Sequence, residues 1–323
     1  MSPHSRHLNS KIGIVLLLIS DVKYTKTITP ERGKVKPFMI LSFHPCFDAN
    51  VQVILGARRL DSPDLELIRD AEAIVLPQGC PEDLFQACSR SDALIFPNYE
   101  MRFKYPGKIG QSLLFKDFRF LHPATLRWPT VDKFKKTYPD PELFPHNLPF
   151  LIKDDKSHEA EGVYFVENRS SLSEALDYLT LRERSGMSGF VTQEFVPSGG
   201  NVLRAVIIGK RVITYWKRPN KPGQVITTIS RNAIIDSEWK PDLQEKGKEQ
   251  AHVLTKKTGI NLAAVDLVFP LSLKRPAPFF LEINYYFGRR GLGGTENYYR
   301  LLYQAVQDWL MEAGLDPKSV RLV

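Results

Sequence analysis

The stretch that decides the fold is FFLEINYYFGRRGLGG, residues 279–294. It begins as an apolar run of strand length and then places Glu282 and Asn284 two residues apart. Residues two apart in a strand share one face, so both side chains point the same way. The glycines that follow permit a close approach of the backbone. This pattern predicts a polar site on an otherwise apolar strand.

A second strand lies upstream, where AAVDLVF at residues 263–269 carries Asp266 in an apolar run. The intervening PLSLKRPAP is typical of a hairpin loop. Antiparallel pairing of the two strands would bring Asp266 close to Glu282 and Asn284. Buried carboxylates are unfavourable unless they are paired or bind a metal, and hard cations such as Mg²⁺ take oxygen ligands. We therefore predict a site that holds Mg²⁺ for a nucleotide.

An alternative interpretation of these three residues stays open at this point. Asp266 could cap a turn, while Glu282 pairs with Arg289 or Arg290. Either arginine could instead bind a carboxylate in a bidentate manner or lie in an ordinary surface loop.

Two segments further upstream fit a nucleotide site. PFLIKDD places Lys153 at a strand end before a polar loop, and an ammonium is a compact charge that suits a triphosphate. FVTQEFVPSGG places Gln193 and Glu194 before a turn. A strand followed by a turn offers backbone edges and side-chain acceptors to a purine amine.

The first hundred residues alternate strand and helix patterns, which predicts a parallel sheet. KIGIVLLLIS, residues 11–20, imitates a signal peptide but is too short to span a membrane, so we expect a buried strand. SPDLELIRDA is predicted as a helix capped by Ser62, and the proline-rich segment 122–149 as a connector with one helical turn. The predicted fold class is α/β, with a parallel-sheet domain at 1–105 and a two-lobed α+β domain at 106–323, its lobes at 106–190 and 191–323.

Composition restricts the partners and the compartment. The 323 residues carry a net charge of +8, but the basic residues are scattered and form no nucleic-acid motif, so nucleic acid is not an expected partner. Cys46, Cys80 and Cys88 lie far apart, which argues against a disulfide framework or a zinc site and fits a reducing cytoplasm. No segment predicts membrane insertion.

From about residue 105 to 312 the order of these pieces resembles the ATP-grasp superfamily. The strongest resemblance is to ligases that attach glutamate to protein or peptide ends, and D-alanine–D-alanine ligase is a more distant relative. VTQEFV looks like the strand that holds adenine, and VLRAVIIGKRVITYWKR like the family's arginine strand pair. ISRN and AVDLVF…FLEIN are similar to the segments that follow.

The resemblance implies an ATP-grasp domain preceded by a parallel-sheet domain, and often a homo-oligomer. It implies an ADP-forming ligase that joins a small-molecule or peptide carboxylate to an amine through an acyl phosphate. The implied cofactors are ATP and Mg²⁺, with Mn²⁺ as an alternative. The implied site residues are Lys108, Lys153, Gln193, Glu194 and Lys217 for nucleotide, Asp266, Glu282 and Asn284 for metal, and Arg204 and Arg231 for phosphate or acyl phosphate.

Departures from the family pattern favour a second hypothesis, a catalytically reduced ATP-binding sensor or regulatory module. The phosphate loop DDKSHEAEGV is acidic and retains only Gly162, although glycine helps backbone N–H groups to cradle phosphate. Its acids would oppose phosphate unless they point away or meet metal or substrate. Val202, Thr228 and Asn232-Ala233 also replace family residues. His44 and His158 are further catalytic candidates, with a surface loop as the alternative for His158.

Overall fold

Four short strands near the start of the described chain form the parallel sheet that the alternating pattern predicts. The computed structural model describes residues 38–140, 142–157, 162–227 and 233–323, so the predicted strand at 11–20, His158 and Arg231 lie outside the described residues. The sheet order is β3-β1-β4-β5, and each neighbouring pair is parallel. Its strands are β1 (Ile40–Ser42), β3 (Val51–Gln52), β4 (Ala73–Val75) and β5 (Leu94–Phe96).

Two helices accompany this sheet, α1 (Ser62–Asp70) and α2 (Glu82–Ser89). The prediction that Ser62 caps α1 is wrong. Asp61 is the cap, because its side chain accepts a hydrogen bond from the backbone N–H of Asp64 at 3.0 Å. Asp64 in turn accepts from the N–H of Asp61, which makes a reciprocal capping box one residue earlier than expected.

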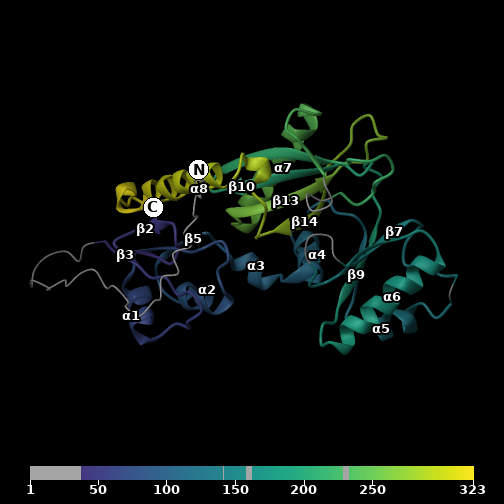
Figure 1. Cartoon of the computed structure of the whole chain (residues 1–323), viewed down its shortest axis with the longest axis horizontal. Helices are drawn as coiled ribbons and strands as arrows, with labels where there is room; N and C mark the ends of the chain where they lie inside the picture. Colours follow the sequence, from purple (N-terminus) through teal and green to yellow (C-terminus); the bar gives the residue numbers. More distant parts are fainter. Residues whose placement is uncertain (1–37, 141, 158–161, 228–232) are drawn as a thin grey trace, which may run out of the picture. The chain divides into compact units, whose positions relative to one another are not determined.

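A second sheet is antiparallel, with the order β6-β9-β7-β8. Its strands are β6 (Thr125–Trp128), β7 (Phe150–Asp154), β8 (Val163–Val166) and β9 (Phe190–Glu194). Helices α5 (Val131–Thr137) and α6 (Arg169–Arg184) share its apolar core, and Figure 1 shows them beside β7 and β9. The prediction of a mere connector at 122–149 is wrong in part, because this segment supplies β6 as an edge strand that pairs with β9.

A third sheet is antiparallel and has the order β12-β11-β10-β13-β14. Its strands are β10 (Val202–Ile208), β11 (Arg211–Arg218), β12 (Ile234–Asp236), β13 (Leu262–Val268) and β14 (Phe279–Asn284). Alternate residues of β10 enter two different cores. Leu203 and Ala205 pack with α4 (Gly107–Asp117) and α7 (Pro241–Thr258), whereas Val206 and Ile208 pack with α8 (Thr295–Glu312).

The remaining elements are α3 (Glu100–Lys104), the short helices η2 (Arg290–Leu292) and η3 (Pro317–Ser319), and the strand pair β2 (Phe47–Asp48) and β15 (Arg321–Leu322). The predicted fold class is confirmed. The domain boundaries stay a prediction, and strand β9 crosses the expected lobe division at 190/191. None of the helices in the described part of the chain combines the length and apolarity that crossing a bilayer requires.

Candidate active site

Three neighbouring strands each contribute one charged side chain at the same level of the sheet. Arg204 on β10 is opposite Asp266 on β13, and Asp266 is opposite Glu282 on β14. The hairpin pairing expected from the sequence is therefore observed. Directly opposite residues of antiparallel strands share a face, so these charges converge on one side of the sheet.

Asp266 is buried and accepts hydrogen bonds from two cations. Arg204 donates from Nε to Oδ1 and from Nη2 to Oδ2, each at 2.8 Å, and Lys217 Nζ donates to Oδ2 at 2.8 Å. Burial alone would raise the pKa of Asp266, but the charges of Arg204 and Lys217 outweigh it and hold this pKa well below the usual range. Burial also lowers the pKa of Lys217, an effect that Asp266 opposes. Asp266 is thus an ionised carboxylate in the middle of a strand, and it does not cap a turn.

Glu282 and Asn284 lie beside this group. The Asn284 Nδ2 donates to Glu282 Oε1 at 3.0 Å and lies 3.4 Å from Asp266 Oδ2. The alternative partner Arg289 instead donates to the Tyr299 hydroxyl at 3.1 Å. An amide nitrogen thus lies between two carboxylates.

The donor set of Asp266, Glu282 and Asn284 fits a hard cation. Two carboxylates and one amide supply the oxygen ligands that Mg²⁺ takes, and a half-turn of the amide exchanges its nitrogen for its oxygen. In this structure the amide N–H₂ group lies between the two carboxylates, and the negative charge of both favours a cation at this position. No group of three or more His, Cys, Asp or Glu side chains suited to a metal occurs among residues 38–140, 142–157, 162–227 and 233–323. Asn284 would therefore have to be the third ligand.

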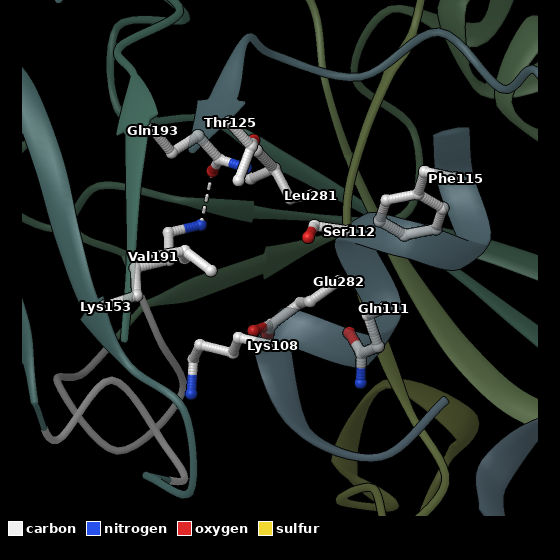
Figure 2. A pocket seen from close by; sticks show the side chains of 10 residues that line it. All are labelled: Lys108, Gln111, Ser112, Phe115, Thr125, Lys153, Val191, Gln193, Leu281 and Glu282. Carbon is white, nitrogen blue, oxygen red and sulfur yellow. Dashed lines mark hydrogen bonds between the residues drawn. The ribbon is translucent and has the colours of Figure 1, made fainter. Parts of the chain in front are cut away.

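A small pocket lies between Glu282 and the β6-β9-β7-β8 sheet (Figure 2). Its volume is about 10 Å³, and it is lined by Lys108, Gln111, Ser112, Phe115, Thr125, Lys153, Val191, Gln193, Leu281 and Glu282. The lining residues come from α4, β6, β7, β9 and β14, which are far apart in the sequence. This volume holds about one water molecule. The pocket therefore brings Lys108, Lys153, Gln193 and Glu282 together, but at a spacing too narrow for an adenine ring.

Lys153 is buried in this pocket and donates from Nζ to Gln193 Oε1 at 2.6 Å. Gln193 donates in turn to the Thr125 hydroxyl at 2.9 Å. Burial lowers the pKa of Lys153 to about 8, although the charge of Glu282 opposes this effect. Lys153 is therefore mostly protonated at pH 7 and loses its positive charge as the pH rises through about 8.

Lys108 points away from Lys153 and Gln193 in Figure 2. Its Nζ donates to the Ser157 carbonyl at 2.6 Å and to the Ser157 hydroxyl at 3.0 Å. Burial lowers the pKa of Lys108, and the charge of Glu282 opposes the shift. Two of the three ammonium N–H groups are thus engaged by the loop that follows β7.

Glu194 lies outside this pocket. It is exposed, as the alternation along β9 requires when Gln193 faces inward. Glu194 instead lines an open cleft of about 590 Å³ together with residues 144–148. The sequence predicts that both residues bind nucleotide, and of the two only Gln193 lines the pocket with Lys153 and Glu282.

The acids of the phosphate loop that the structure describes have direct partners other than the pocket lysines. Asp154 pairs with Arg182 on α6 at 3.0 Å, and Asp155 accepts from the Ile109 N–H at 2.7 Å. His44 is also placed away from this pocket, where its ring stacks on Phe47. Burial, followed by the charge of Arg289, lowers the pKa of His44 to about 4, so its ring is neutral at pH 7.

Gln111 on α4 is a site residue that sequence reasoning missed. Its side-chain amide donates to the Ile283 carbonyl at 2.7 Å and accepts from the Ile283 N–H at 2.9 Å. It thereby satisfies the free edge of β14 at the residue between Glu282 and Asn284. The helical pattern of α4 identifies the helix, but no local signal identifies this contact across 172 positions.

Part of the chain is similar in sequence to known proteins. No family model matches the chain. It is 25% identical over 154 residues to the probable alpha-L-glutamate ligase 2 of Hahella chejuensis, with 47% of each chain covered. It is 29% identical over 121 residues to the probable alpha-L-glutamate ligase of Pasteurella multocida, with 37% of this chain and 36% of the relative covered. The chain thus spans about half, or less, of the length of these curated relatives.

Solved structures show a similar fold. The D-alanine–D-alanine ligase of Bacillus anthracis superposes with a TM-score of 0.52 at 14% identity, covering 81% of this chain and 84% of that one. The corresponding enzyme of Helicobacter pylori gives a TM-score of 0.51 at 18% identity, covering 72% and 71%. The chain therefore has a fold similar to that of the D-alanine–D-alanine ligases, and part of its sequence is similar to the alpha-L-glutamate ligases.

Proposed function

We propose that the protein is an ATP-dependent ligase that joins a carboxylate to an amine through an acyl phosphate. The single observation that carries this proposal is the pocket that Lys108, Lys153 and Glu282 line beside the Arg204–Asp266 pair. Two lysines and a carboxylate that line one pocket suit a triphosphate with its counter-ion. The similarity to glutamate ligases supports the same reaction class.

The nucleotide would lie between the two sheets. Lys108 and Lys153 would neutralise phosphate oxygens, because a lysine ammonium acts as a compact charge. Gln193 would face the adenine from β9, where it already exchanges hydrogen bonds with Lys153 and Thr125. Since the pocket holds only about one water molecule, its lining residues would have to move apart before a nucleotide could enter.

Asp266, Glu282 and Asn284 would hold Mg²⁺ or Mn²⁺. A bound divalent cation would neutralise charge on the transferred phosphoryl group. Glu282 is the ligand best placed for this role, because it lines the nucleotide pocket and is next to Asn284. Asp266 is more remote, since its oxygens already face Arg204 and Lys217.

The reaction would proceed in two displacements. A substrate carboxylate oxygen attacks the γ-phosphorus of ATP, the bond to the β,γ-bridging oxygen breaks, and ADP leaves. An amine then attacks the acyl carbon, inorganic phosphate leaves, and the nitrogen loses a proton. Arg204 would stabilise the acyl phosphate from the face of the sheet, with Arg231 in the same role. Preorganised charge of this kind is typically the largest contribution to such catalysis.

One observation favours the second candidate, a nucleotide-binding sensor without turnover. Both Asp266 oxygens are already hydrogen-bonded to cations, so this carboxylate is neutralised without a metal. A sensor would bind nucleotide with Mg²⁺ and release no ADP with any acceptor.

ADP release distinguishes the two functions. The protein is incubated with ATP, Mg²⁺ and a panel of amino acids and peptides, each as carboxylate and as amine. A ligase releases ADP only when both substrates are present. In Glu282→Ala this rate should fall by about 10² to 10³, as is typical for loss of one preorganised group, while circular dichroism shows an unchanged fold. Glu245→Ala serves as the control, because Glu245 lies in an exposed pair with Lys248. Wild-type turnover in the Glu282 variant would falsify the metal assignment.

A further inference from the structure

The loop after β7 is tied to helix α4 by Asp155. The side-chain Oδ1 of Asp155 accepts a hydrogen bond from the Ile109 N–H at 2.7 Å, and its carbonyl accepts from the Lys108 N–H at 3.2 Å. These N–H groups belong to the first turn of α4, which has no intrahelical partners for them. Pro106, at the cap position, makes no side-chain cap hydrogen bond. Asp155 therefore supplies from another segment the cap that α4 lacks.

The contact is close enough to restrict the residue at position 107. A Cβ atom on Gly107 would lie 2.5 to 2.7 Å from the Asp155 carboxylate, and Gly107 has a φ of +67°. Both the space and the backbone angle exclude an ordinary side chain. Asp155 is itself anchored, because its N–H donates to the Gly189 carbonyl at 3.0 Å. The carboxylate thus has a fixed position against the start of α4.

Lys108 is held from both ends by the same loop. Its backbone N–H bonds to Asp155, and its ammonium donates to the Ser157 carbonyl and hydroxyl. Since the stem of a lysine side chain is flexible, contacts at both the backbone and the ammonium are needed to fix its position. Loss of the Asp155 contact would release the first turn of α4 and with it Lys108.

We propose that Asp155 is a positioning residue that fixes Lys108 at the nucleotide pocket by capping α4 from the loop after β7. This role accounts for the presence of the acidic residue Asp155 in a loop next to a proposed phosphate site. The carboxylate accepts from the Ile109 N–H of α4, and its negative charge is thereby directed at a helix N-terminus. The proposed role of Asp155 rests on the proposed function only in that a nucleoside triphosphate is the ligand that Lys108 would bind.

Two variants and a matched control test this proposal. Asp155→Ala removes the cap, and Asp155→Asn keeps an oxygen that can accept from Ile109. Asp61→Ala removes an equivalent aspartate cap, from helix α1. The affinity for a non-hydrolysable ATP analogue with Mg²⁺ is measured by calorimetry for each. Asp155→Ala should bind about tenfold more weakly, with Asp155→Asn within about threefold of wild type. Asp61→Ala should lower the melting temperature without changing the affinity.

A second measurement does not depend on nucleotide binding. Acetylation of Lys108 by acetic anhydride is followed by mass spectrometry, with the exposed Lys116 of the same helix as internal reference. The ratio of Lys108 to Lys116 modification should rise several-fold in Asp155→Ala and stay near wild type in Asp155→Asn and Asp61→Ala. An unchanged ratio in Asp155→Ala overturns the proposal. Failure of the wild-type protein to bind nucleotide would instead count against the proposed function, while the acetylation ratio would still decide the role of Asp155.

Discussion

Arg204 and Asp266 form a two-point ion pair across the β10–β13 ladder, with both nitrogen–oxygen distances at 2.8 Å. Lys217 completes a buried group of three charges. Such groups contribute little net stability compared with apolar residues, but removal of one member is costly because the others stay buried. Their presence in an otherwise apolar sheet is therefore best explained by chemistry at the site.

The first prediction concerns the stability of this pair. Arg204→Ala should lower the free energy of unfolding by about 3 kcal/mol, because Asp266 keeps only Lys217 as a compensating charge. Urea denaturation at pH 7 measures the change. Lys136→Ala is the control, since Lys136 pairs with Asp132 on an exposed helix surface and should cost no more than about 0.5 kcal/mol. Equal effects of the two substitutions would contradict the buried character of the Arg204 pair.

The second prediction is a pH dependence of nucleotide affinity. Burial lowers the pKa of Lys153 to about 8, with Glu282 acting against the shift and Lys108 reinforcing it. As pH rises through 8, Lys153 loses its proton and its attraction for phosphate. Affinity for ADP should therefore fall between pH 7 and pH 9, by at most about tenfold per pH unit above the pKa.

Lys153→Arg separates this effect from the titration of Lys108. A guanidinium stays charged throughout this pH range, so the variant should show a flatter profile whatever its absolute affinity. The lowered pKa of Lys153 also predicts how the free energy of unfolding changes with pH. The pKa of Lys153 is lower in the folded state than in the unfolded state, so its burial penalty is present below pH 8 and relieved as pH rises toward 10.5. Parallel affinity profiles for the two proteins would exclude Lys153 as the titrating group.

The third prediction concerns the glycine-rich loop after β14. A Cβ atom on Gly291 would lie 2.1 to 2.5 Å from ring atoms of Tyr215, a fully buried residue opposite Arg204 on β11. Gly291→Ala should lower the free energy of unfolding by about 1–3 kcal/mol, as overpacking of a core does. Gly288→Ala lies in the same loop with no atom within 4 Å of the added carbon and should be nearly neutral. Thermal denaturation of both variants compares them directly.

The part of the site that lies within one hairpin could be predicted from sequence. The two-residue spacing of Glu282 and Asn284, and the position of Asp266 in a preceding apolar run, follow from strand alternation and a short connecting loop. The parallel sheet follows from the alternation of strands and helices in the same way. These features depend on local periodicity, which a single sequence displays.

Contacts between distant segments could not be predicted. Asp155 meets Ile109 across 46 positions, and Gln111 meets Ile283 across 172. Such hydrogen bonds depend on how helices and sheets pack, and neither residue type nor spacing indicates them in advance. Glu194 is exposed because alternation in β9 lets one of two adjacent residues face the pocket, and its predicted role in binding nucleotide stays a prediction.

The last prediction tests whether the edge of β14 is held in place by α4. Gln111 pairs with both backbone groups of Ile283, between the expected metal ligands Glu282 and Asn284. Gln111→Ala leaves these backbone groups without that partner and frees the strand that carries both ligands. Mg²⁺-dependent binding of an ATP analogue should weaken by about tenfold, which corresponds to about 1.4 kcal/mol of binding free energy.

The control for this substitution is Gln86→Ala, because the Gln86 side chain donates to Glu82 on an exposed helix surface. Calorimetric titrations with and without Mg²⁺ separate the two contributions. A loss seen only with Mg²⁺ indicates that Gln111 acts through the ligands on β14. An equal loss without Mg²⁺ would mean that Gln111, which itself lines the pocket, acts on the nucleotide directly, and would contradict the role assigned to it.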